Sequence, residues 1–235
     1  MYIVFLIILA VIFALVPILD AFVFGKKEPR NMPTTATDKE KIKCKSYYST
    51  IAYLWCLALP VVFMCIIGGI NPANIGFRGI TFTQSIWLTV TILVAAFALF
   101  VYEFVYPMVS PKYRNSVMQE PDAVDEYPQT TKEKWLYSLQ TLSSAICEES
   151  VYRGFLFFLL ITVFPGMSIY LILLITFVSF GMGHLYQGWS GVIETGLFGA
   201  LSMGLIIVTG SLTPSILLHF FGDFAPAFMV RKRIV

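Results

Sequence analysis

Long apolar stretches separated by short polar ones run through the whole chain. Each is about 20 residues long, which is the length that an α-helix needs to cross a bilayer. They cover residues 2–24, 47–70, 85–108, 135–164, 168–186, 190–209 and 213–230. Lipid permits only helices and closed β-barrels as spanning structures, and these stretches are too continuously apolar for alternating barrel strands. The pattern therefore predicts an all-α, polytopic transmembrane helical bundle of about seven spans.

The composition agrees with a lipid environment. Hydrophobic residues make up 57% of the chain and charged residues only 13%, with a mean hydropathy of +0.78, whereas a soluble domain is about 25% charged. No basic tract with interleaved aromatic residues stands on a soluble domain, so nucleic acid is not an expected partner. We expect an integral, multi-pass protein in contact with membrane lipid. The short chain, without long extramembrane domains, favours a prokaryotic cell membrane.

The distribution of the 16 Lys and Arg residues predicts the orientation. Seven lie in the loop 25–45, four in the loop 109–134, and three at residues 231–233. Cytoplasmic loops carry the excess of Lys and Arg. With seven spans and the N-terminus outside, all of these residues fall on the cytoplasmic side, together with the C-terminus. Only Arg78, in an outside loop, and Arg153, inside a helix, are left over.

The first cluster of candidate chemistry lies on the fourth apolar stretch, in the run Cys147-Glu148-Glu149-Ser150-Val151-Tyr152-Arg153-Gly154. Glu149 and Arg153 are four residues apart, so they can pair on one helix face. Glu148 points about 100° away from Glu149 on a regular helix, where it is suited to act as a general base. A structural Glu–Arg pair that locks helices together explains Glu149 and Arg153, but it does not explain Glu148.

The chain has two histidines, and both lie in apolar stretches. His184 stands beside two glycines, which let another backbone or a substrate approach closely. His219 and Asp223 are four residues apart and face the same way, which suits two metal ligands or two groups that reach one substrate atom. Either histidine alone could be a helix-pairing residue. Ionisable groups are costly in lipid, so three such groups on three stretches predict one shared intramembrane site.

Three short patterns carry a resemblance to a known family. Glu148-Glu149-x-x-x-Arg153, Phe180-x-x-x-His184 and His219-x-x-x-Asp223 resemble, in order and spacing, the motifs of the CPBP intramembrane proteases. That family comprises the type II CAAX prenyl endopeptidases and the bacteriocin-processing or self-immunity proteins of the Abi type. The resemblance covers about residues 135–225. It implies a catalytic four-helix core at 135–235, preceded by an N-terminal three-span region with cytoplasmic loops at 1–134.

The resemblance implies an endopeptidase that cleaves a membrane-associated peptide or lipidated protein, such as a prenylated CAAX-type protein or a leader peptide. Glu148 would activate a water with the assistance of His184. Glu149 and Arg153 would orient the site. The remaining pair, His219 and Asp223, would hold or stabilise the developing oxyanion.

Asp223 departs from the family pattern, which often has Asn at this position. An ionised Asp cannot donate a hydrogen bond to an oxyanion, so Asp223 is protonated, binds a metal, or only orients His219. One expectation is a Zn²⁺ ion held by His184 and His219 with a carboxylate. The other is metal-free hydrolysis driven by glutamate.

Two functions outside proteolysis also fit the pattern. One is a non-catalytic immunity or regulatory membrane protein that keeps the motif residues for structure or binding. The other is an ion-coupled transporter, since intramembrane His and Glu also serve there, although the sequence shows no repeat between its halves and no paired broken helices. Of two further membrane acids, Glu103 is expected to reach toward the membrane surface. Glu194 is expected to do the same or to pair helices, and the alternative is a supporting group at the same cavity as the motif residues.

Overall fold

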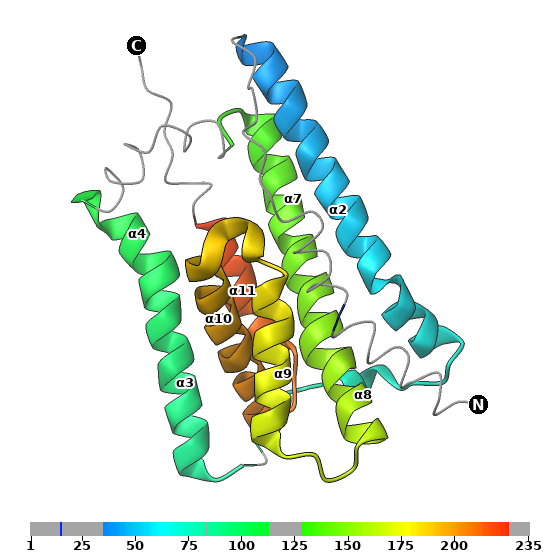
Figure 1. The fold of residues 1–235 in the computed structure, drawn as a ribbon. Coiled ribbons are helices and arrows are strands. Elements are labelled where there is room, and N and C mark those ends of the chain that lie inside the picture. Colours follow the sequence, from blue (N-terminus) through cyan, green and yellow to red (C-terminus); the bar gives the residue numbers. More distant parts are fainter. Residues whose placement is uncertain (1–14, 16–34, 83, 113–127, 226–235) are drawn as a thin grey trace. The chain divides into compact units, whose positions relative to one another are not determined.

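The computed structural model describes residues 15, 35–82, 84–112 and 128–225, and every regular element among them is helical (Figure 1). Several parts of the predictions lie outside the described residues: the first span 2–24 apart from Leu15, residues 25–34 of the loop 25–45, residues 113–127 of the loop 109–134, residues 226–230 of the last stretch, and the basic residues 231–233.

The elements before residue 113 are α2 (Ala36–Ile66), the 3₁₀-helix η1 (Pro72–Ile75), α3 (Ile86–Phe100), the π-helix η2 (Val101–Val105) and α4 (Tyr106–Val109). The last three follow one another directly and match the predicted stretch 85–108. α2 begins well before the predicted stretch 47–70. The hydroxyl of Thr35 accepts the N–H of Asp38 at 3.2 Å, and a cap of this kind lets polar residues form the first turns of a helix.

The C-terminal half contains α7 (Thr131–Glu148), the π-helix η3 (Glu149–Phe155), α8 (Leu156–Val163), α9 (Ile169–Met182), the 3₁₀-helix η4 (Leu185–Gln187), α10 (Gly188–Thr209) and α11 (Thr213–Phe224). α7, η3 and α8 form one continuous helical stretch, which matches the predicted stretch 135–164. α10 matches the predicted stretch 190–209.

α9 ends earlier than the sequence pattern suggests. The predicted stretch was 168–186, but α9 stops at Met182 and His184 lies in the turn before η4. The N–H of Gly183 bonds to Ser179 O at 3.4 Å, and the N–H of His184 to Gly181 O at 2.9 Å, which tightens the last turn. Glycine favours such helix ends because it weakens the helix interior. His184 is therefore a turn residue rather than a helical one.

Three of the described helices are long and apolar enough to cross a membrane: Ala36–Ile66, Ile86–Val105 and Leu185–Thr209. Ile169–Met182 is a shorter apolar helix. The stretch from α7 to α8 carries the charges of the first motif. The described part of the chain is thus all-helical, and three of its helices are suited to cross a membrane. The total of seven spans and the orientation of the termini stay predictions.

The described residues divide into two compact units. The first contains Ala58–Leu93 and Glu148–Ser215, and the second contains 35–57, Val94–Cys147 and 216–225. In the first unit α9 and α10 lie side by side (Figure 1). Their close approach needs small residues, because a Cβ atom on Gly181 would lie 2.5 Å from Val192 O.

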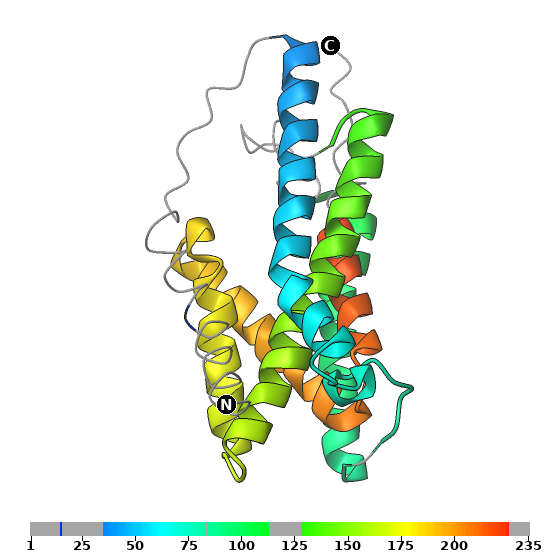
Figure 2. The same ribbon diagram turned by 90° about the vertical axis from the view of Figure 1, so that its right-hand side faces the viewer.

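In the second unit the first part of α2 and α7 run side by side in both views (Figures 1 and 2). Cys44, Tyr47 and Leu136 form a small buried cluster between them, with Tyr137 packed against it. The Tyr47 and Tyr137 rings meet edge to face at 5.7 Å. Further along α2, the indole N–H of Trp55 donates to the Ser143 hydroxyl at 3.3 Å.

Candidate active site

The first motif begins at Glu148, the last residue of α7, and continues on the π-helix η3, whose seven residues are all buried. π-Helical turns inside α-helices are rare and occur frequently at functional sites. Arg153 Nη1 lies 3.3 Å from Glu149 Oε1, and both side chains are fully buried. The predicted ion pair between these two residues is therefore confirmed. The expected angle of about 100° between Glu148 and Glu149 holds only for a regular α-helix, and the wider π turn begins between them.

Phe180 joins the first motif to the second. The Arg153 guanidinium carbon lies 3.7 Å from the centroid of the buried Phe180 ring, a contact that is strongest when it is desolvated. The Phe180 and His184 rings lie 4.7 Å apart between centroids. The first unit therefore brings Glu149, Arg153 and His184 together around one aromatic ring.

The backbone of Phe180 also sets the proton on His184. His184 Nδ1 lies 2.9 Å from Phe180 O. A carbonyl oxygen only accepts hydrogen bonds, so Nδ1 carries the proton and Nε2 of the neutral ring carries a lone pair. The half-buried ring can therefore accept a hydrogen bond from a water through Nε2. A histidine that binds a metal is held by the same kind of hydrogen bond.

Glu148 is the last residue of α7 and lies directly before the π-helix. It is half-buried, whereas its neighbour Glu149 is fully buried. A general base must touch the water that it activates; Glu148 is more accessible than Glu149, although its Oε2 atom is buried. Glu149, which is closed off with Arg153, is suited to a positioning role.

The third motif lies in the second unit. His219 Nε2 is 3.4 Å from Asp223 Oδ2, and the two side chains are 7% and 47% exposed. The contact shows that these two residues face the same way, as their spacing predicts. The Tyr137 hydroxyl donates to Asp223 O at 3.0 Å, which ties α7 to the end of α11. One site that contains all six motif residues stays a prediction.

The C-terminal half carries a family signature that covers all three motifs. Residues 130–225 match the family model described as type II CAAX prenyl endopeptidase Rce1-like. This part of the chain, called the Rce1-like domain below, therefore resembles the CAAX protease family. No curated protein and no solved structure gives a match. Glu148, Glu149, Arg153, His184, His219 and Asp223 all lie within the matched residues, so the predicted site falls in the region that resembles a protease family.

The zinc expectation depends on which possible metal ligands lie together in the Rce1-like domain. Among the described residues, no group of three or more His, Cys, Asp or Glu side chains gathers in a way that could hold a metal ion. His219 has Asp223 beside it, and His184 offers Nε2. The zinc site therefore stays a prediction, beside the metal-free alternative.

Two residues near the motifs of the Rce1-like domain have contacts that the sequence did not predict. In the sequence, Phe180 is only the first residue of the second motif. Its place one helical turn before His184 is the signal that could have predicted the contact between the two rings. Glu103, expected at the membrane surface, is half-buried and reaches the third motif. A Cβ atom on Gly222 would lie 2.8 Å from Glu103 Oε2, so Gly222 makes room for this carboxylate.

Proposed function

We propose that this protein is an intramembrane endopeptidase that hydrolyses a peptide bond in a membrane-associated substrate, such as a prenylated CAAX-type protein or a leader peptide. The observation that supports the proposal most is that Arg153 contacts the Phe180 ring while His184 bonds to the Phe180 carbonyl oxygen. Glu148 directly precedes Glu149, the partner of Arg153. The Rce1-like family supplies the reaction class and a peptide or prenylated protein as substrate.

In the proposed reaction, Glu148 takes a proton from a water molecule while His184 Nε2 accepts a hydrogen bond from the same water. The hydroxide adds to the carbonyl carbon of the scissile bond, and the carbonyl oxygen becomes an oxyanion. Glu148 then gives its proton to the amide nitrogen as the carbon–nitrogen bond breaks. General acid–base catalysis of this kind contributes roughly 10²–10⁴-fold to the rate.

The other four motif residues support Glu148 and His184. The buried pair of Glu149 and Arg153 positions the Phe180 ring, and through it the imidazole of His184. His219 stabilises the oxyanion. Asp223 orients His219 through the contact at 3.4 Å, which is the role open to an ionised carboxylate that cannot donate a hydrogen bond.

The test uses the full chain, purified in detergent, with a panel of prenylated peptides, unprenylated peptides and leader peptides. Glu148→Gln keeps the shape of the side chain and removes the base. It should abolish cleavage, detected by mass spectrometry of the products, while the melting temperature stays unchanged. Glu194→Gln is the matched control, because Glu194 is an exposed acid on α10 and its loss should leave cleavage intact. Cleavage by Glu148→Gln would end the general-base role.

The same purified protein and peptide panel distinguish the proposed protease from the other possible functions. A wild-type protein that binds peptides from the panel but cleaves none would support the non-catalytic immunity or regulatory function. The zinc expectation is tested by metal analysis together with chelator treatment. Full activity without bound metal would leave the glutamate-driven reaction, and loss of activity that zinc restores would support the metalloprotease.

A further inference from the structure

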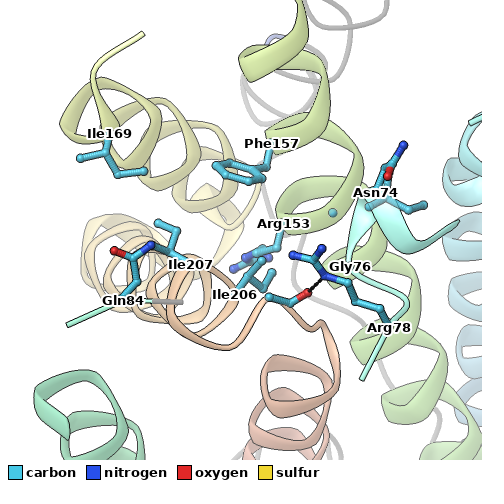
Figure 3. A pocket seen from close by; sticks show the side chains of 12 residues that line it. Asn74, Gly76, Arg78, Gln84, Arg153, Phe157, Ile169, Ile206 and Ile207 are labelled. Atoms are coloured by element: carbon cyan, nitrogen blue, oxygen red, sulfur yellow. Dashed lines mark hydrogen bonds between the residues drawn. The ribbon is translucent and has the colours of Figure 1, made fainter. Parts of the chain in front are cut away.

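The first unit contains a pocket that shares only Arg153 with the residues of the proposed reaction. Its volume is about 290 Å³, and its wall combines polar residues with isoleucines (Figure 3). The polar part is formed by Asn74, Arg78, Gln84 and Arg153, and the apolar part includes Ile206 and Ile207. The pocket lies where η1 and the loop after it meet the end of α10. It is slightly smaller than a typical ligand site of about 300–1,000 Å³, which suits a small chemical group.

Arg153 brings unused donors to this pocket. Its side chain is fully buried, and none of its three guanidinium nitrogens has a hydrogen bond among the described residues. Glu149 balances its charge at 3.3 Å, but the five N–H donors of a guanidinium are not matched by acceptors. A buried donor without an acceptor is destabilising. An acceptor from outside the chain would remove that cost.

Arg78 is the second cation, and its position is fixed by the backbone. Its Nε donates to Gly210 O at 2.6 Å, and the Ser211 hydroxyl donates to Arg78 O at 2.7 Å. The N–H of Thr81 bonds to Thr209 O at 2.8 Å, which ties the same loop to the end of α10. Figure 3 shows both guanidinium groups reaching toward the middle of the pocket. The position of Arg78 is therefore fixed by contacts within the protein and does not require a ligand.

The charge of the pocket selects an anion. Two arginines line it and no Asp or Glu does. With Glu149 beside Arg153, the local balance is two positive charges minus one negative charge, or +1. Arginine forks match phosphate and carboxylate oxygens with two parallel hydrogen bonds. Asn74 and Gln84 add amide donors at the rim.

The surroundings of the pocket favour a lipid as the source of that anion. The loop between η1 and α3, together with the first turn of α3, exposes large apolar side chains: Phe77, Ile80, Phe82, Ile86 and Trp87. Exposed apolar patches mark contacts with membranes or partners, and aromatic residues gather at membrane interfaces. Arg78 lies within this loop, so a cation stands beside apolar side chains that can contact lipid.

We propose that this pocket binds the phosphate group of a membrane phospholipid, held between Arg78 and Arg153, with the glycerol portion against Ile206 and Ile207. The site is separate from the water-activating residues, and the proposal does not depend on protease activity.

The experiment measures binding to the full chain in phosphate-free detergent by native mass spectrometry. The ligands are a short-chain phosphatidylglycerol, the matching diacylglycerol without phosphate, inorganic phosphate, and a peptide with a free C-terminal carboxylate. The phosphatidylglycerol should bind at least tenfold more tightly than any of the other three. Asn74→Asp places an acid in the lining without a change of shape, and Arg78→Gln removes a cation. Each should weaken phosphatidylglycerol binding roughly tenfold, as expected for a charged hydrogen bond.

Lys45→Gln is the matched control, because it removes an exposed cation in α2, and it should bind phosphatidylglycerol like the wild type. If Arg78→Gln does not fold, Asn74→Asp decides the result. Equal binding of the diacylglycerol would overturn the phosphate assignment. Inorganic phosphate that binds as tightly as the lipid would assign the pocket to the free ion, and tighter binding of the peptide would assign it to a peptide terminus. Either result would overturn the lipid proposal.

Discussion

The guanidinium carbon of Arg153 lies 3.7 Å from the centroid of the Phe180 ring, and Phe180 O lies 2.9 Å from His184 Nδ1. One aromatic residue therefore contacts a cation of the first motif and the imidazole of the second. Both Glu149 and the Phe180 ring stabilise the positive charge of Arg153. This arrangement gives a physical reason for an aromatic residue four positions before the histidine.

Phe180→Leu should lower cleavage by about tenfold or more while the protein stays folded. The variant keeps an apolar side chain but removes the ring over Arg153, a contact worth about 2 kcal/mol when desolvated. kcat/KM and the melting temperature are measured together. Phe198→Leu is the control, because its ring lies farther from the guanidinium, at 5.7 Å, and a smaller effect is expected. Equal losses in both variants would show that Phe180 acts only through packing.

Glu149→Gln should destabilise the protein by about 3–5 kcal/mol, because it leaves the buried charge of Arg153 without its counter-charge. The double variant Glu149→Gln/Arg153→Met removes both charges and should recover most of that loss, but it should remain inactive. Unfolding in denaturant gives the stability, and peptide cleavage gives the activity. Activity in the double variant would contradict the positioning role of the pair.

A surface ion pair provides the comparison for this result. Lys41 Nζ lies 3.4 Å from Asp38 Oδ1, with both side chains at least half exposed. Exposed pairs contribute little because water and salt screen them. Lys41→Gln should therefore leave the unfolding curve unchanged.

Local features of the site could be predicted from the sequence, and tertiary ones could not. The contacts of Glu149 with Arg153 and of His219 with Asp223 follow from spacing along a single helix. The contact of Arg153 with Phe180 depends on how η3 packs against α9, which no spacing within one segment reveals. The apolar pattern also extended the fifth stretch past His184, because hydropathy does not register how two glycines end a helix.

Gly154 shows the same distinction, since it directly follows the first motif but nothing in the sequence explains a glycine there. A Cβ atom there would lie 2.5 Å from Ile75 O and 3.2 Å from Leu212 Cδ1. Gly154→Ala should therefore cost about 1–3 kcal/mol of stability, because overpacking forces the backbone of η1 to move. Gly79→Ala is the control, because a Cβ atom there would meet nothing within 4 Å. The melting temperatures of Gly154→Ala and Gly79→Ala are compared. Equal melting temperatures would show that η1 moves without a cost in stability.

Asp223→Asn should retain cleavage within about threefold of the wild type if Asp223 acts only by orienting His219. The amide has the same shape as the carboxylate and can hold the ring by a hydrogen bond in place of charge. His219→Ala should lower kcat by roughly 10²–10³-fold, the usual loss when one oxyanion donor is removed. The measurement is kcat and KM on the best peptide of the panel. A loss in Asp223→Asn as large as that in His219→Ala, reversed by neither zinc nor a change of substrate, would show that the carboxylate charge itself takes part in the reaction.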